Sequence, residues 1–438
     1  NMTKTIKYIF LLTAILVTGA YAHAQEGAYG AYSPYSIYGI GDISAQGTAF
    51  NKGMGGVGIA TRNKRFINYL NPASVTARDT LSFMADFGLS QKNTIYRQGD
   101  LKSGNNTFNI YDFVMSFPIY RSSAFMVGIT PFSDVGYDFS SVEDNPEIIG
   151  NTGNIEYDSY GTGSIYQLFL GAGVTFWDKL SVGAEALYLF GNIDKLTNMT
   201  YSNTSYRSIN GGNELSVNAF TGKFGLQYEQ ELGGNVSMVA GVTYRMGTDL
   251  KGYSTEYRYA TLSSVTDTLR HNIDTLARSG LKVADEIGVG IALRGGDKWS
   301  AEFNYTRSDW TKSGFDKAAG FAVSGDSKFS SSVSQSFRAG FEITPNRNDI
   351  RYYFRKCTYR AGVYHEQAYY KLDGNNVNST GLTLGITLPV FRLYNGLTLG
   401  IDLGQRSNSR NNMIRERYAM FAIGFNIHDL WFKKASYE

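Results

Sequence analysis

From about residue 81 onward, apolar and polar residues alternate in short runs. In Leu397–Gly404 every odd position is a branched aliphatic residue and every even position is small or acidic, and Trp299–Thr306 has the same rhythm. Successive side chains of a strand point to opposite faces, so this period predicts strands with one apolar and one polar face. A soluble β-protein and a membrane barrel share the period, and the surrounding sequence has to separate them.

The alternating runs number about fourteen, within the even-numbered range of bacterial outer-membrane barrels. They lie at about 81–97, 105–120, 122–136, 158–176, 179–195, 214–230, 235–250, 284–294, 298–312, 330–344, 355–370, 378–390, 396–408 and 416–427.

The connections alternate in length. Short ones with turn-forming residues lie at 177–179, 233–235 and 295–298, and longer ones at 137–157, 196–213, 251–283 and 313–329. Short periplasmic turns and longer external loops are typical of an outer-membrane barrel. We therefore predict an all-β fold, a transmembrane antiparallel β-barrel of about 14 strands.

The two faces of the strands separate by parity. Apolar columns such as Phe125/Val127/Ile129 should face lipid. The opposite, lumen-facing columns carry charges of both signs: Asp86, Glu185, Lys223, Arg245, Glu302, Arg338, Glu342, Arg360 and Asp402. Such charges pair across strands or contact a solute, and the column alone does not define a substrate.

The N-terminus carries the marks of a leader. Lys4 and Lys7 precede an apolar run at 8–17, and Ala22-His23-Ala24 fits a small-x-small cleavage site, so residues 1–24 are predicted to be a signal peptide. The expected division is then a segment at 25–78, the barrel at 79–432 ending in the aromatic pair Trp431-Phe432, and a short periplasmic tail at 433–438. No later run reaches the length of a membrane-spanning helix.

Composition removes several classes of function. Charged residues make up 18% of the chain, with 49 Gly, 32 Tyr, one Cys, four His and a net charge of +3. This charge is too small to favour nucleic acid, and a single Cys excludes a disulfide framework. We expect no metal or other cofactor and no enzymatic activity, because His365 has no Ser beside it on its column.

Residues 25–78 are rich in small residues and lack a strand period. Gly53, Gly55, Gly56 and Gly58 do not form a phosphate-binding loop, because the strand–turn–helix context and the Lys-Ser pair are missing. Glycines permit close backbone packing, so we interpret the segment as a plug folded inside the barrel.

This glycine-rich segment, followed by Asn71-Pro72-Ala73 just before the first strand of a fourteen-strand barrel, resembles the long-chain fatty acid outer-membrane transporter family. This FadL-type family includes secretion-shuttle relatives. The resemblance implies that the segment is a hatch, with Asn71, Pro72 and Ala73 at its end, and that hydrophobic ligands leave sideways through the wall. It carries over no ligand-contacting residue.

The third strand contains Pro131, followed by Ser133 and Asp134. Proline cannot donate to a sheet ladder, so it lies at the external end of the strand or breaks the pairing and opens the wall. In the resembled family a kink in the same strand forms the lateral exit. Both interpretations stay open.

Two functions remain. The first is passive uptake of a hydrophobic compound across the Gram-negative outer membrane, with lipid and a hydrophobic small molecule as partners. The alternative is a non-transporting scaffold subunit of a secretion or assembly complex that binds other outer-membrane proteins, with Tyr253, Tyr257, Arg258 and Tyr259 as a contact surface. An open porin is disfavoured, because about fifty residues precede the first strand.

Overall fold

The computed structural model describes residues 32–78, 82–120, 122–262, 265–276, 280–317, 328–390, 396–407 and 413–430. The predicted signal peptide, residues 25–31, the pair Trp431-Phe432 and the predicted tail lie outside the described residues. Among the described residues, no helix combines the length and the apolar character needed to cross a membrane.

The strands form one closed antiparallel barrel of 14 strands, as predicted. The first and last strands, β2 and β20, close the ring, with Phe87 opposite Phe425. The main strands are β2 (Ser82–Gln98), β3 (Leu101–Tyr120), β4 (Ser123–Val142), β5 (Ile155–Phe176), β6 (Leu180–Tyr201), β7 (Ser208–Gly233), β8 (Val236–Arg245), β10 (Lys251–Leu262), β11 (Val265–Thr275), β13 (Glu286–Gly295), β14 (Trp299–Asp309), β16 (Val333–Ile343), β17 (Thr358–Leu372), β18 (Asn375–Pro389), β19 (Gly396–Ser407) and β20 (Arg415–Leu430).

Shorter elements complete the fold. They are η1 (Pro34–Ile37), β1 (Asp42–Ile43), α2 (Ala49–Lys52), η2 (Pro72–Thr76), α3 (Pro146–Thr152), β9 (Thr248–Asp249), β12 (Lys282–Val283), β15 (Phe329–Ser331) and η3 (Tyr353–Arg355). β8 pairs with the second half of β7 within the ring, whereas β10 pairs with its first half and β11 pairs with β10 beyond the ring, so neither β10 nor β11 counts among the 14 barrel strands.

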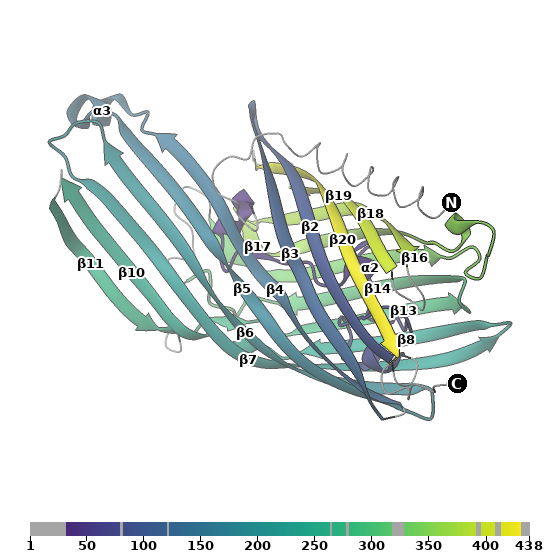
Figure 1. The fold of residues 1–438 in the computed structure, drawn as a ribbon. Helices are drawn as coiled ribbons and strands as arrows, with labels where there is room; N and C mark the ends of the chain where they lie inside the picture. Colours follow the sequence, from purple (N-terminus) through teal and green to yellow (C-terminus); the bar gives the residue numbers. More distant parts are fainter. Residues whose placement is uncertain are drawn as a thin grey trace, which may run out of the picture.

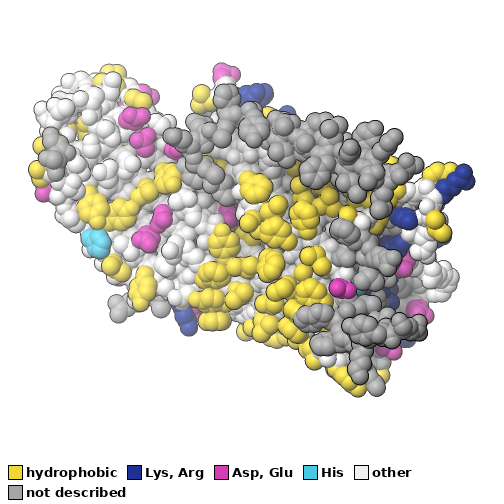
Figure 2. All heavy atoms as spheres, in the orientation of Figure 1, with side chains coloured by type: hydrophobic (Ala, Val, Ile, Leu, Met, Phe, Trp, Pro, Cys, Tyr) yellow, Lys and Arg dark blue, Asp and Glu magenta, His cyan; other side chains and the backbone are white. Residues whose placement is uncertain are grey.

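The predicted faces match the burial of the strands. Phe125 and Val127 lie on the outward side of β4, while Ala124 and Met126, which alternate with them, are buried. Hydrophobic side chains gather on the outer surface over the central part of the barrel, whereas the projecting part that carries α3 is more polar (Figure 2). We assign the central band to the lipid-facing surface.

The predictions of three external loops, at 137–157, 196–213 and 251–283, are wrong in part, because strands continue into these ranges. β4 runs to Val142, β6 to Tyr201, and β10 and β11 form a hairpin within 251–283. β7 has 26 residues, or about 86 Å at 3.3 Å per residue, against a hydrocarbon core of about 30 Å. The excess forms a curved sheet of β4–β7, β10 and β11 beyond the barrel (Figure 1).

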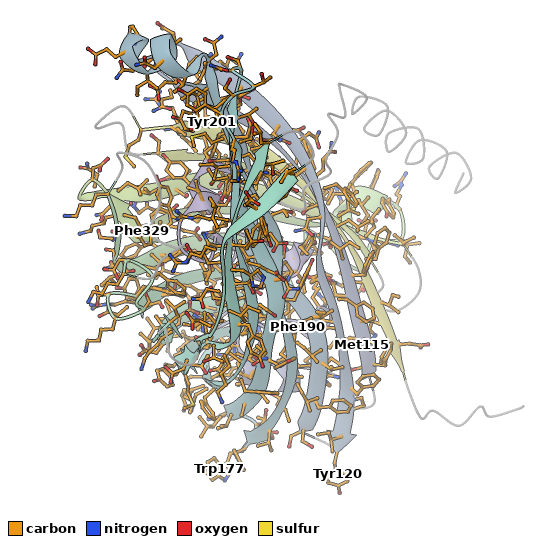
Figure 3. The ribbon with its side chains drawn as sticks, turned by 90° about the vertical axis from the view of Figure 1, so that its left-hand side faces the viewer. Met115, Tyr120, Trp177, Phe190, Tyr201 and Phe329 are labelled. Carbon is orange, nitrogen blue, oxygen red and sulfur yellow. The ribbon has the colours of Figure 1, made fainter. Side chains whose placement is uncertain are left out.

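The two ends of the barrel differ. The short turns are confirmed, with positive φ at Trp177, Asp178 and Asn235. Tyr120 and Trp177 lie at the tips of this end, and Tyr201 lies in the opposite, projecting part (Figure 3). We assign the short-turn end to the periplasm. Among the connections described at this end, residues 344–357 between β16 and β17 are an unusually long one.

Candidate functional site

The N-terminal segment, residues 32–78, runs through the interior of the ring (Figure 1). At the external end the carbonyl of Tyr32 accepts a hydrogen bond from the Tyr96 hydroxyl at 2.8 Å. At the periplasmic end Arg65 pairs with Asp297 at 2.8 Å. The segment therefore extends along the lumen from one end to the other.

Three of the predicted glycines, Gly53, Gly55 and Gly56, lie where the segment touches the wall, whereas Gly58 packs within the segment, where a Cβ would lie 2.6 Å from Leu70. Gly55, with φ +73°, donates its N–H to the Thr383 hydroxyl at 2.7 Å. A Cβ on Gly56 would lie 2.0 Å from the guanidinium of Arg338, and a Cβ on Gly53 would lie 3.0 Å from Gly385 Cα. Wall glycines also take part, since a Cβ on Gly340 would lie 2.3 Å from the Met54 carbonyl. Sequence reasoning missed these wall partners, because a glycine in a strand carries no signal of what approaches it.

Asn71, Pro72 and Ala73 are brought together at a second contact with the wall. The Asn71 side chain caps η2 by accepting the Ala73 N–H at 3.0 Å, and its amide donates to the Ile59 carbonyl at 2.7 Å. Its Oδ1 lies 2.0 Å from the position of a Cβ on Gly225 of β7. The motif therefore joins two parts of the segment and seats them on β7.

Charged residues predicted for the lumen form two kinds of contact. Across strands, Arg360 pairs with Glu342 at 2.8 Å, Lys223 lies 4.0 Å from Glu185, and Arg338 pairs with Glu366. Others hold the N-terminal segment.

Between the wall and the segment, Glu302 accepts the Ala60 N–H at 2.8 Å. Arg406 pairs with Asp42 at 2.7 Å, and Glu416 accepts the Ser33 hydroxyl at 2.5 Å. Lumen charges therefore anchor the segment as well as the wall.

The external half of the lumen is filled by an apolar cluster, here called the outer cluster. The segment contributes Tyr35, Tyr38 and Ile40, each at most 9% exposed. The wall and its connections contribute Phe132, Val135, Tyr137, Ile165, Leu189, Ile193, Leu215, Val217, Ala219, Leu250, Leu276, Leu281, Val283, Ala284, Trp310, Phe315, Phe329, Tyr369, Tyr370, Leu372 and Val377. These side chains form one buried apolar core.

A cavity of about 230 Å³ lies between the segment and the wall. Its lining includes the charged side chains Asp42, Glu185, Lys223, Arg245, Glu286, Arg338, Glu366 and Arg406. Apolar groups such as Phe132, Phe169 and Trp310 line other parts. The lining therefore combines charges of both signs with apolar side chains.

The third predicted site lies where the wall divides. The ladder between β3 and β4 ends at Phe113 opposite Ile129. Beyond it β3 continues to Leu101 with β2, and β4 continues to Val142 with β5. The register of β4 and β5 shifts between Pro131 and Ser133.

The N-terminal segment takes the place of β3 as the neighbour of β4 beyond Ile129. Ser133 and Asp134 pair with Ile43 and Asp42 of β1. The Pro131 carbonyl accepts a hydrogen bond from Gln46 at 2.8 Å. The predicted residues are therefore together at the split, and the strand partner supplied by the segment was not foreseen.

Among the described residues, no three His, Cys, Asp or Glu side chains are placed to hold a metal ion. His365 lies on the outward face, with Nδ1 2.9 Å from the Thr380 hydroxyl.

Solved structures share this architecture at low sequence identity. The CymD monoaromatic hydrocarbon channel is 16% identical, with a TM-score of 0.56 over 86% of this chain and 96% of that one. The toluene transporter TbuX of Ralstonia pickettii is 16% identical, with a TM-score of 0.56 over 86% and 97%. A Pseudomonas aeruginosa FadL homologue is 12% identical, with a TM-score of 0.51 over 88% and 98%. These likenesses confirm the predicted FadL-type outer-membrane barrel fold.

No curated protein matches the sequence. One family model, named BamG, matches residues 2–438. This match spans both the N-terminal segment and the whole barrel, and the chain belongs to the BamG family.

Proposed function

We propose that this protein is a partner-binding barrel subunit of an outer-membrane assembly complex. The observation that carries the proposal is the outer cluster. Tyr35, Tyr38 and Ile40 occupy the part of the lumen beneath the external connections, where uptake of a hydrophobic compound requires an apolar pocket. A ligand would have to displace a packed core, at a cost of several kcal/mol (about 2–5 for each large side chain).

Two further observations support the same role. The cavity borders the outer cluster, which shares Phe132, Trp310 and Tyr369 with its lining, and it also holds charges of both signs whose hydration an apolar solute would remove. The family name BamG points to an assembly subunit rather than to a channel. The N-terminal segment then serves as a fixed plug that seals the lumen and braces the wall.

The projecting sheet offers a surface for such partners. Tyr253 of β10 is 58% exposed, and the Tyr257 and Tyr259 rings lie 5.5 Å apart on the same strand. Arg258, also on β10, is exposed on the opposite face of the sheet. Exposed Tyr and Arg are enriched in the centres of protein interfaces.

Purification in mild detergent followed by native mass spectrometry tests the proposal. We expect a stoichiometric complex with other outer-membrane proteins and no bound apolar ligand. Tyr253→Ser with Arg258→Gln should lower the partner yield, while Ile148→Ser on α3 serves as the matched external control. A barrel that purifies alone with a fatty acid or hydrocarbon bound would refute the scaffold role.

A second candidate is uptake of a hydrophobic compound with lateral release. It is supported by the split between β3 and β4 at Pro131 and by the fold shared with hydrocarbon channels. Here Ser133 and Asp134 would border the opening, and movement of β1 away from them would control it.

Uptake of radiolabelled toluene by cells that carry the protein tests this candidate. If a path crosses the outer cluster, Tyr38→Ala with Ile40→Ala should raise uptake, and Tyr166→Ala on the outer surface should not. Equal uptake with and without the protein would exclude it.

A further inference from the structure

The connection between β16 and β17, residues 344–357, has a composition that neither proposed function explains. Its place at the periplasmic end is set by the Thr344 N–H, which donates to the Lys298 carbonyl in the β13–β14 turn at 2.7 Å. A tight turn would suffice to join the two strands, as it does at Trp177–Lys179. The extra residues therefore call for a role of their own.

This connection is strongly basic. It contains Arg347, Arg351, Arg355 and Lys356 against a single acid, Asp349, so its formal charge of +3 equals that of the whole chain. Ile350 between them is 97% exposed, the most exposed large apolar side chain among the described residues. Phe354 is 69% exposed.

The connection is folded rather than loose. Asp349 Oδ1 accepts the N–H groups of Arg351 and Tyr352 at 2.8 and 2.7 Å. The Asn346 N–H donates to the Arg355 carbonyl at 2.8 Å. Arg351 and Arg355 both lie against the Tyr352 ring, with Cζ 5.6 and 4.9 Å from its centroid. Two guanidinium groups are thus held beside one ring.

The fold directs the connection toward the lipid-facing surface. Tyr359 belongs to the outward column of β17 and pairs with Ile343, which is exposed on β16. The Tyr359 hydroxyl donates to the Phe354 carbonyl at 3.0 Å. Phe354 therefore lies at the outer rim of the barrel, next to the surface that contacts the hydrocarbon core.

We propose that residues 344–357 bind anionic phospholipid of the inner leaflet. Arg347, Arg351 and Arg355 contact the head-group phosphates, and Ile350 and Phe354 reach the boundary of the acyl chains. Basic residues close to a membrane surface are attracted by anionic lipid, and aromatic residues favour the interface. The position at the lipid-facing rim favours lipid over a periplasmic protein. The inference holds for either proposed function.

Site-directed spin labelling tests the proposal. In a Cys357→Ser background, Ile350→Cys carries a nitroxide, and accessibility to dioxygen and to a water-soluble nickel chelate is measured. Val363→Cys on the outward face of β17 supplies the lipid reference, and Ile148→Cys on α3 the water reference. The full chain is reconstituted in phosphatidylcholine vesicles with and without phosphatidylglycerol, and it is also labelled in native outer membranes.

We expect the label at position 350 to be more accessible to dioxygen than to nickel, most clearly with phosphatidylglycerol present. Nickel accessibility equal to that of the Ile148→Cys reference in both kinds of vesicle would overturn the proposal. Shielding from both reagents in native membranes would also overturn it, since a protein would then cover the site.

A charge variant tests the head-group contacts separately. Arg347→Gln with Arg351→Gln and Arg355→Gln should lower the phosphatidylglycerol that copurifies in mild detergent by about five-fold for each arginine removed. Arg207→Gln, an exposed arginine at the external end, is the control and should leave it unchanged. Equal retention in the triple variant would exclude recognition of the head group.

Discussion

Gly362 of β17 and Gly55 of the N-terminal segment lie in direct backbone contact. A Cβ on Gly362 would lie 2.2 Å from the backbone nitrogen of Gly55, with φ +73° at Gly55 itself. Neither position accepts a side chain while the segment keeps its place. The pair therefore sets how closely the segment packs on the wall.

Gly362→Ala tests this contact. The methyl group meets backbone on the facing side, which cannot rotate away, so we expect a loss of about 1–3 kcal/mol of unfolding free energy. The segment should also become more sensitive to protease. Gly400→Ala is the control, because the nearest atom to its Cβ is 3.6 Å away. Equal stability of the two variants, measured by heat-modifiable gel mobility, would contradict the packing argument.

Arg360 is a buried charge of the wall that lies against the segment. Its Nε lies 2.8 Å from Glu342, and its Cζ lies 4.8 and 5.0 Å from the Phe50 and Phe66 rings. Glu342→Gln should cost about 3 kcal/mol, because it leaves the guanidinium without its counter-charge.

The double variant Arg360→Met with Glu342→Gln should recover part of this loss, as unfolding in urea would measure. Arg207→Gln is the matched surface control. It breaks an exposed pair with Asp267 and should cost less than about 1 kcal/mol. A double variant less stable than Glu342→Gln alone would show that Arg360 acts through its stacking rather than its charge.

Asp42 links β1 to β19 through Arg406 at 2.7 Å. Asp42→Asn removes this counter-charge, although Glu416 remains 3.7 Å from the same guanidinium. We expect faster amide hydrogen exchange at Ile43 and at Ser133, its partner in β4, because local opening becomes easier. Asp267→Asn in the external sheet should leave exchange at both positions unchanged.

Cys357 is a buried thiol just before β17. Burial raises its pKa to about 11, so little thiolate exists at neutral pH. We expect negligible labelling by maleimide in the folded barrel and complete labelling after denaturation. Because the folded pKa is raised, the folded state holds the proton more tightly. The stability linked to this thiol is present below the ordinary pKa of about 9 and is lost as pH rises through about 11. Rapid labelling of the folded barrel at neutral pH would contradict its burial.

Part of the fold is encoded in local sequence. The alternation in Leu397–Gly404 predicts a strand and its outward face, and the turn residues at 177–179 predict a hairpin. A strand that crosses the lipid must present an apolar column to it, so each crossing strand can be predicted from its own sequence. The same reason explains why the hairpin within 251–283 was predicted to be a loop. β10 and β11 stand outside the lipid and need no apolar column, so the hairpin resembles a polar loop in sequence.

The candidate site is mostly non-local. Asn71 and Gly55 could be singled out from composition, but Gly225 and Gly362, which receive them, lie far along the chain. Pro131 predicted an irregularity in the third strand, yet it could not indicate that β1 would pair there in place of β3.

By itself, therefore, the sequence determined the strand period, the number of membrane-crossing strands and their lipid-facing columns. It also determined that the N-terminal segment, which is rich in small residues and lacks a strand period, is not a strand of the barrel. Each of these features follows from strand geometry and from the requirement that every strand in contact with lipid presents an apolar face to it. Only the tertiary structure decided that Tyr35, Tyr38 and Ile40 complete a closed core in the lumen, and that the wall divides beside them. Both features depend on contacts between residues that are far apart in the sequence. Such contacts form only when the whole barrel is assembled, so no single strand encodes them.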